Sequence, residues 1–244
     1  MLKERYTNVF ANVSENLSYL NSGTVSLDID AVTQATYVLA LNKVGHILGK
    51  AVHKEQLITY WELANIARLN GIPEDKTMDF ARSAWNDENV YLNAPVMPGI
   101  LTLLNIFNEV GTPYIFISSR PAEFEEVTKK WFSQNIPFVK SESIILGRQE
   151  GVSGGDFKSR MIKEFGVVLH IEDAVEEAVK IVEATPAKII IVPQPWNEAR
   201  TIQHPRIKYL GNHIETKGVW PVVRYLASNE ARNFLALSHN IHVP

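Results

Sequence analysis

Short, largely apolar runs alternate with amphipathic segments along the second half of the chain. The apolar runs lie at 114–117, 143–146, 167–171 and 188–192. Segments with helical spacing precede or separate them, at 100–110, 122–134, 156–165 and 174–184. Continuous apolar strands are typical of a sheet covered by helices on both faces. The pattern therefore predicts a doubly wound α/β domain built on a parallel sheet.

An earlier strand is predicted at 24–27, and an all-helical stretch follows it. Apolar residues recur at helical spacing from Tyr37 to Leu48 and from Leu57 to Ala67, and Pro73 is expected in the first turn of a third helix. The expected organisation is an N-terminal arm at 1–21, an α/β core formed by 22–33 and 96–244, and a helical insertion at 34–95.

Composition narrows the chemistry that the chain can perform. The 244 residues include no cysteine, which excludes disulfides, thiolate catalysis and Cys-ligated metals. A net charge of −3 gives no basic field, so neither a nucleic acid polymer nor a membrane is expected as a partner. No signal peptide or membrane span is recognisable, and a cytoplasmic location is the default expectation. With 27 acidic residues, any metal is expected to be a hard divalent cation.

Polar residues stand where the predicted strands end. Asp28 and Asp30 follow the first strand, Ser118 follows the strand at 114–117, and Asp173 follows the strand at 167–171. In parallel sheets the ligand site lies beyond the carboxyl ends of the strands, so these side chains are expected to converge. Three carboxylates in one place call for a cation, and Mg²⁺ suits oxygen ligands.

Each of these residues has an ordinary explanation when taken singly. Asp28 and Asp30 could form a turn or cap a helix, and Asp173 could cap the helix that begins near Ala174. Ser118 could be a simple strand-end hydroxyl and Lys158 a solvated helix lysine. Their joint order along the chain favours a catalytic site.

With a metal bound, the set could perform phosphoryl transfer. Asp28 would attack phosphorus as the nucleophile, and Asp30 would protonate the leaving oxygen and later activate water. Ser118 and Lys158 would stabilise charge on the phosphoryl oxygens. Lys163 is an alternative to Lys158 as the lysine that stabilises this charge, but Lys158 is nearer the N-terminal end of the helix.

The chain resembles the haloacid dehalogenase (HAD) superfamily of phosphohydrolases from about residue 24 onward. Four motifs carry the resemblance, namely Leu27-Asp28-Ile29-Asp30-Ala31-Val32, Ile117-Ser118-Ser119-Arg120-Pro121, Lys158 and Ile171-Glu172-Asp173. Further stretches resemble the branch that contains the 5′(3′)-deoxyribonucleotidases, namely Pro98-Gly99, Ser119-Arg120-Pro121 with 127–131, and Pro195-Trp196-Asn197.

This resemblance implies a Rossmann-like core with a helical cap at 34–95 inserted after the first strand. It implies Mg²⁺ held by the side chains of Asp28 and Asp173 and by the backbone carbonyl of Asp30. The chain departs from the family pattern at Ala31, where glycine is usual and would adopt the backbone turn more freely.

Substrate contacts are less sharply marked. Ser119 and Arg120 are candidates for substrate binding, although Arg120 could equally form a structural salt bridge. Tyr60, Trp61 and Trp85 could stack on a nucleobase, but aromatic residues on a helix face usually belong to the core. Trp196 and His170 are expected to be buried in the core, and how the arm and 229–244 pack is left open.

The leading hypothesis is a Mg²⁺-dependent phosphomonoester hydrolase that forms an aspartyl phosphate. Its expected partner is a small phosphorylated metabolite, with a nucleoside monophosphate as the favoured class. Two alternatives stay open, a phosphatase for sugar or other small phosphates and a non-catalytic binding protein of the same fold. A homo-oligomer is also left open.

Overall fold

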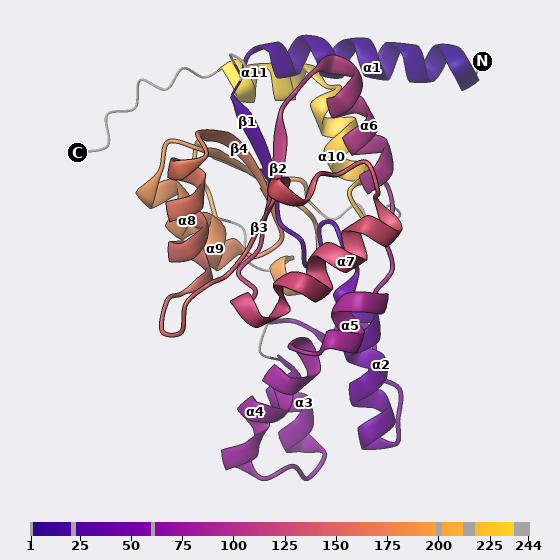
Figure 1. The fold of residues 1–244 in the computed structure, drawn as a ribbon, viewed down its shortest axis with the longest axis vertical. Coiled ribbons are helices and arrows are strands. Elements are labelled where there is room, and N and C mark those ends of the chain that lie inside the picture. The colour runs from indigo at the N-terminus through magenta and orange to yellow at the C-terminus, as the bar shows by residue number, and fades with distance from the viewer. Residues whose placement is uncertain (1, 21–22, 60–61, 199–201, 212–217, 237–244) are drawn as a thin grey trace.

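The computed structural model describes residues 2–20, 23–59, 62–198, 202–211 and 218–236. One sheet holds six parallel strands in the order β3-β2-β1-β4-β5-β6 (Figure 1). The strands are β1 Thr24–Leu27, β2 Tyr114–Ile117, β3 Ile144–Ile145, β4 Val167–Glu172, β5 Lys188–Ile191 and β6 Ile207–Tyr209. The predicted doubly wound, Rossmann-like α/β fold is confirmed, with β1 in the middle of the sheet.

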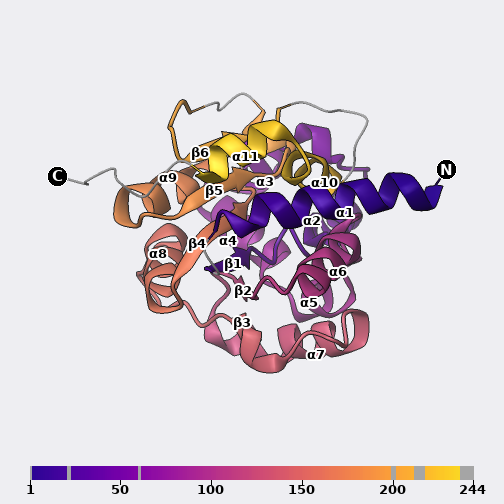
Figure 2. The ribbon, with the colours of Figure 1, turned by 90° about the horizontal axis from the view of Figure 1, so that it is seen from above.

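Helices cover both faces of this sheet, as the apolar strands require. The helices α8 (Gly154–Glu164) and α9 (Val175–Ala184) lie on one side, and α6 (Ile100–Val110), α7 (Glu125–Asn135) and α10 (Trp220–Leu226) lie on the other (Figures 1 and 2). Successive strand side chains point to opposite faces. Ile117 accordingly packs in the core beside α8 and α9, whereas Phe116 packs in the larger core on the other face.

The insertion after β1 is helical and lies beyond the carboxyl ends of the strands (Figure 1). We call it the helical block, and it comprises α2 Thr36–Leu48, η1 Lys54–Gln56, α3 Glu62–Leu69, α4 Glu74–Trp85 and α5 Glu88–Asn93. The two chain connections to the core run side by side. Ala35 donates a backbone hydrogen bond to Pro95 (2.8 Å), and Met97 donates one to Thr33 (2.9 Å).

The structure differs from the predicted elements in short segments. The second predicted helix starts at Glu62 rather than near Leu57, and Pro73 immediately precedes α4 instead of occupying its first turn. The elements α5, β6, α10 and α11 (Asn229–Ala236) were not predicted. β6 is only three residues long and half-buried, so it lacks the continuous apolar run that marks the other strands. Tyr60 and Trp61 lie outside the described residues.

The N-terminal arm is the helix α1 (Leu2–Ser18), which packs along α10 and α11 (Asn229–Ala236) at the end of the sheet opposite the helical block (Figures 1 and 2). The side-chain amide of Asn16 donates hydrogen bonds to the carbonyls of Leu226 (2.7 Å) and Ser228 (2.9 Å). Part of the arm and of the C-terminal region therefore packs on the chain's own core. Within the described residues, no helix is both long and apolar enough to cross a membrane.

Candidate active site

The segment that follows β1 is a tight loop that holds two aspartates at the sheet edge. The Asp28 N–H donates to Ile171 of β4 (2.9 Å), which extends the sheet by one residue, and the Thr33 hydroxyl donates to the Asp28 carbonyl (2.7 Å). Ala31 turns the loop with a φ of 57°, the left-handed region that glycine adopts more easily. The Gln194 side chain donates to the Ala31 carbonyl (2.9 Å) and ties the turn to the core.

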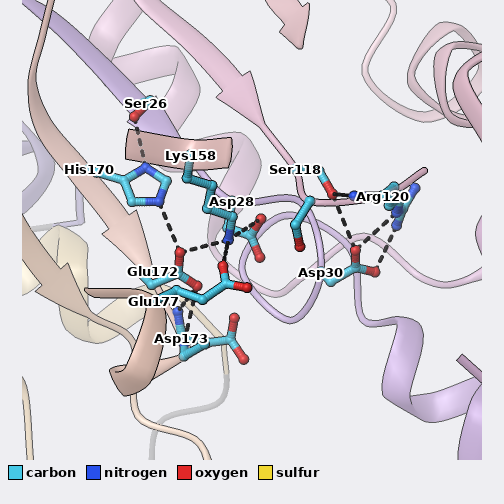
Figure 3. A network of polar contacts seen from close by, with 12 residues as sticks. Ser26, Asp28, Asp30, Ser118, Arg120, Lys158, His170, Glu172, Asp173 and Glu177 are labelled. Carbon is cyan, nitrogen blue, oxygen red and sulfur yellow. Dashed lines mark hydrogen bonds and ion pairs between the residues drawn. The ribbon is translucent and has the colours of Figure 1, made fainter. Parts of the chain in front are cut away.

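The Asp28 carboxylate is paired with a buried lysine. Lys158 on α8 is 1% exposed, and its ammonium lies 2.9 Å from Asp28, 2.7 Å from Glu172 and 2.6 Å from Glu177 (Figure 3). Burial alone would lower the pKa of Lys158, but the three carboxylates raise it well above its ordinary value. Lys158 is therefore held as a cation beside Asp28, whereas Lys163 is exposed on the same helix.

A buried chain of polar side chains lies behind Lys158. Ser26 contacts His170 Nδ1 (2.7 Å), and His170 Nε2 lies 3.0 Å from the same Glu172 oxygen that binds Lys158 (Figure 3). The other Glu172 oxygen accepts the backbone N–H groups of Asp173 (2.9 Å) and Ala174 (3.1 Å). Burial opposes ionisation of Glu172, but Lys158 and His170 outweigh it and lower its pKa. His170 is thus a hydrogen-bonded core residue, as predicted, and it is connected to the site.

The second aspartate is held by an arginine from the second motif. Arg120 is 3% exposed and donates to both oxygens of Asp30, from Nε (2.9 Å) and Nη2 (2.8 Å). Its remaining contacts go to Thr128 (2.9 Å) and Gln34 (2.5 Å), and its guanidinium carbon lies 3.9 Å from the Tyr91 ring centroid. Of the two roles considered for Arg120, substrate binding and a salt bridge, the structure shows the salt bridge.

Ser118 stands beside this pair and is 1% exposed. Its hydroxyl lies 3.5 Å from Asp30, at the limit of a hydrogen bond, and accepts the Arg120 N–H at 3.3 Å (Figure 3). Burial would raise the pKa of Asp30, but Arg120 outweighs burial, so the pKa is lowered. Asp30 is therefore a stable carboxylate in this arrangement.

Asp28, Glu172 and Asp173 offer carboxylate oxygens that lie within 4.8 Å of one another. Burial and neighbouring carboxylates raise the pKa values of Asp28 and Asp173 well above their ordinary range. Glu172 binds Lys158 and two N–H groups, Asp28 shares that single ammonium, and Asp173 has no ion pair among the described residues, so a further positive charge beside Asp28 and Asp173 is favourable. This donor set fits a hard cation such as Mg²⁺. The Asp30 side chain points instead to Arg120.

The carboxylates line a cavity of about 450 Å³ between the sheet edge and the helical block. Its apolar wall consists largely of aromatic side chains, from Tyr37, Trp85, Tyr91 and Trp196. Trp196 also donates its indole N–H to Asp173 (2.8 Å) and meets Tyr37 edge-on at 6.0 Å. Trp196 is largely buried, with 9% of its surface exposed, as expected for a core residue. Its hydrogen bond also orients Asp173.

The structure brings the predicted residues of all four motifs to one end of the sheet, and Ser119 also lines the cavity. Sequence reasoning missed Glu172 and Glu177 as the partners of Lys158, and Gln34 as a partner of Arg120. Glu172 was visible as part of the fourth motif, whereas Glu177 lies in the first turn of α9, where an acidic residue is unremarkable.

Comparisons with known proteins agree with this architecture. No protein-family model matches the chain. “Putative nucleotidase BH1399” from Halalkalibacterium halodurans is 25% identical over 178 residues, which cover 72% of this chain and 82% of that protein.

Two solved structures illustrate the likeness in fold. A HAD hydrolase of family IA, variant 3, from Entamoeba histolytica superposes with a TM-score of 0.55 at 14% identity, covering 87% of this chain and 99% of that chain. A HAD family hydrolase from Deinococcus radiodurans, with bound phosphate and sodium, gives a TM-score of 0.52 at 16% identity, covering 79% and 92%. The chain therefore has the fold of the haloacid dehalogenase hydrolases.

Proposed function

We propose that this protein is a Mg²⁺-dependent phosphomonoester hydrolase that uses Asp28 as its nucleophile. The observation that carries the proposal is the Asp28 carboxylate itself. It lies at the carboxyl end of the central strand, is paired with buried Lys158 at 2.9 Å, and lines a cavity of about 450 Å³. That position suits a nucleophile that meets a phosphate in a site shielded from bulk water.

The proposed reaction has two halves. In the first, an Asp28 oxygen bonds to phosphorus while the bond to the leaving oxygen breaks. Asp30 enters this half in its protonated form, which the neighbouring anionic phosphate favours once the substrate is bound, and gives its proton to the leaving oxygen. In the second, water attacks phosphorus and gives its proton to Asp30, which releases inorganic phosphate and restores the Asp28 carboxylate. Lys158 and Ser118 stabilise negative charge on the phosphoryl oxygens throughout.

Asp28, Asp173 and the backbone carbonyl of Asp30 would hold Mg²⁺. The raised pKa values of Asp28 and Asp173 support this assignment, because a cation relieves the cost of ionising buried neighbouring carboxyls. When bound, Mg²⁺ neutralises charge on both the carboxylates and the phosphate. Trp196 keeps one Asp173 oxygen in a set direction through its indole N–H.

A nucleoside monophosphate is the substrate class we favour. The aromatic wall of the cavity, formed by residues such as Tyr37 and Trp85, suits a planar base. The curated relative is named a nucleotidase, which supports the same choice. A sugar phosphate is the second candidate, and it would leave the aromatic wall without a stacking partner. The paired Asp28 and Lys158 disfavour a purely non-catalytic role.

The test is phosphate release from a panel of nucleoside monophosphates and sugar phosphates, with and without Mg²⁺. Asp28→Asn should abolish release and remain folded, whereas Asp75→Asn, an exposed aspartate on α4, should retain full activity. Acid-quenched wild-type protein should carry a phosphoryl group by mass spectrometry, and the Asp28→Asn variant should carry none. Full activity in Asp28→Asn, or the same rate in excess chelator, would refute the mechanism.

A further inference from the structure

A second, smaller cavity adjoins the first on the far side of Asp30. It has a volume of about 170 Å³ and lies between the helical block and the second motif. Asp30, Trp85, Tyr91 and Ser119 line both cavities, so the two spaces share one wall. Figure 3 shows Arg120 on the opposite side of Asp30 from Lys158, and Arg120 is one of the residues that line the second cavity.

The two cavities have opposite charge. Among the described residues that line the first, six carboxylates face one ammonium, that of Lys158. The described lining of the second holds a single carboxylate, that of Asp30, and three guanidinium groups, those of Arg82, Arg120 and Arg148. The first cavity therefore needs a cation, and the second favours an anion.

Arg120 contributes little to this excess, because its bidentate pair with Asp30 cancels both charges. Arg148 is different. Its guanidinium donates to the carbonyls of Ser119 (2.7 Å) and Val152 (2.7 Å), which hold it in place without neutralising it. Its hydrogen bonds use Nε and Nη1, and within the described residues it forms no ion pair, so further N–H donors remain for a ligand.

Arg82 supplies a second cation, from the side of the cavity opposite Arg148, and its charge is only weakly compensated. It lies on α4 of the helical block, and its only ion pair in the described chain is with exposed Asp79 at 3.3 Å. A pair between exposed side chains is weak and easily exchanged for a stronger partner. Arg82 and Arg148 thus reach the same space from the helical block and from the core.

We propose that the Arg82–Arg148 cavity is a subsite for a second anionic group, a phosphate or a carboxylate, on the leaving part of the substrate. This inference rests on the proposed function, because it places the reactive phosphate beside Asp28 in the first cavity. The shared wall of Trp85 and Tyr91 would then lie along the middle of the substrate. The favoured substrate therefore changes from a nucleoside monophosphate to a phosphomonoester with a second anionic group on its leaving part, such as a nucleoside bisphosphate.

The test is a comparison of matched ligands by calorimetric titration in the presence of Mg²⁺. A nucleoside 5′-monophosphate is paired with its 3′,5′-bisphosphate, and glycerol 3-phosphate is paired with 3-phosphoglycerate, which adds a carboxylate instead. The Asp28→Asn chain serves as the background, so that ligands are not consumed. We expect the doubly charged member of at least one pair to bind about ten-fold more tightly or better.

Arg82→Ala in that background should remove most of this advantage, and Arg148→Gln should do the same while it keeps a side-chain donor for the carbonyls. Arg68→Ala is the matched control, since Arg68 lies on neighbouring α3 and pairs with Glu74 outside the cavity. Equal affinity within both pairs, or an advantage that survives both arginine variants, would overturn the subsite. Arg82-dependent binding in a protein that hydrolyses no substrate would instead refute the proposed function and retain the subsite.

Discussion

The guanidinium of Arg120 and the carboxylate of Asp30 form a two-pronged pair, with Nε–Oδ2 at 2.9 Å and Nη2–Oδ1 at 2.8 Å. This geometry sets the direction of the Asp30 side chain as well as its charge. Because Arg120 lowers the pKa of Asp30, the group rests as a carboxylate, the form that the second half of the proposed reaction requires. Proton donation to a leaving group is the half-reaction that Arg120 opposes.

Removal of Arg120 should therefore change the pH dependence of turnover. In Arg120→Ala, the main contribution that lowers the pKa of Asp30 is lost, so this pKa rises. The acid limb of kcat should move to higher pH, since the carboxylate is lost sooner as the pH falls. Arg120→Lys keeps the positive charge but loses the paired hydrogen bonds to both Asp30 oxygens, so the acid limb should shift less. An acid limb at the same pH in folded Arg120→Ala protein would exclude this role.

Lys158→Met should destabilise the fold in a pH-dependent way. The substitution leaves the buried carboxylates of Asp28 and Glu172, and the half-buried one of Glu177, without their cation, which typically costs about 3–5 kcal/mol. The pKa of Asp28, already raised by burial, then rises further above its unfolded value, so stability falls as the pH rises through the folded value. Denaturant unfolding should show a larger loss at pH 8 than at pH 5. Lys163→Met, at an exposed position on the same helix, should show neither effect.

Mg²⁺ should raise the melting temperature. Binding to the folded state alone gives about 2.7 kcal/mol at 100 times the Kd, or roughly 5–10 °C for a chain of this size. Asp28 and Asp173 have raised pKa values, so the apo-protein loses stability as the pH rises through them, and the Mg²⁺ effect should be larger at pH 8 than at pH 5.

Thermal melts of Asp173→Asn should show little response to Mg²⁺, whereas Asp156→Asn, which changes an exposed aspartate, should respond like the wild type. An undiminished Mg²⁺ response in Asp173→Asn would place the metal elsewhere.

Ala31→Gly should stabilise the protein. Ala31 has a φ of 57°, where a Cβ costs about 1–2 kcal/mol, and the greater freedom of glycine in the unfolded chain returns part of that gain. We expect a net gain of about 1 kcal/mol, seen by calorimetry as a rise of roughly 2–4 °C. Ala35→Gly is the control, because Ala35 has an ordinary φ of −82° and should be destabilised by glycine. Destabilisation of both variants would contradict the strain at Ala31.

Gly154→Ala should impair catalysis more than folding. A Cβ at Gly154 would lie 1.9 Å from Glu177 Oε1, so the carboxylate must move, and Glu177 is one of the groups that holds Lys158. The displaced atom is at the end of a flexible side chain, so we expect the free energy of unfolding to change by less than about 1 kcal/mol. We expect kcat to fall several-fold. Glu177→Gln should reproduce the kinetic defect, and wild-type kcat in both variants would remove Glu177 from the site.

Much of the fold could be predicted because the strands at the centre of the sheet are continuous apolar runs. The strand predicted at 188–192, for example, corresponds to β5, and all four residues of β5 are buried. Among the elements that escaped prediction, α5 and β6 are short, and their residues carry no such periodicity. β6 is recognisable only because β5 pairs with it, with Ile189 opposite Ile207.

The sequence by itself determined that Asp28 and Asp30 follow the central strand and that Lys158 lies near the start of a helix, because local patterns define where elements begin and end. Only the tertiary structure decided which groups these residues meet. Arg120 reaches Asp30 across 90 positions, and Glu177 reaches Lys158 because α8 and α9 pack together. Such contacts depend on how helices pack on the sheet and on one another, and the spacing of residues along the chain carries no record of that packing.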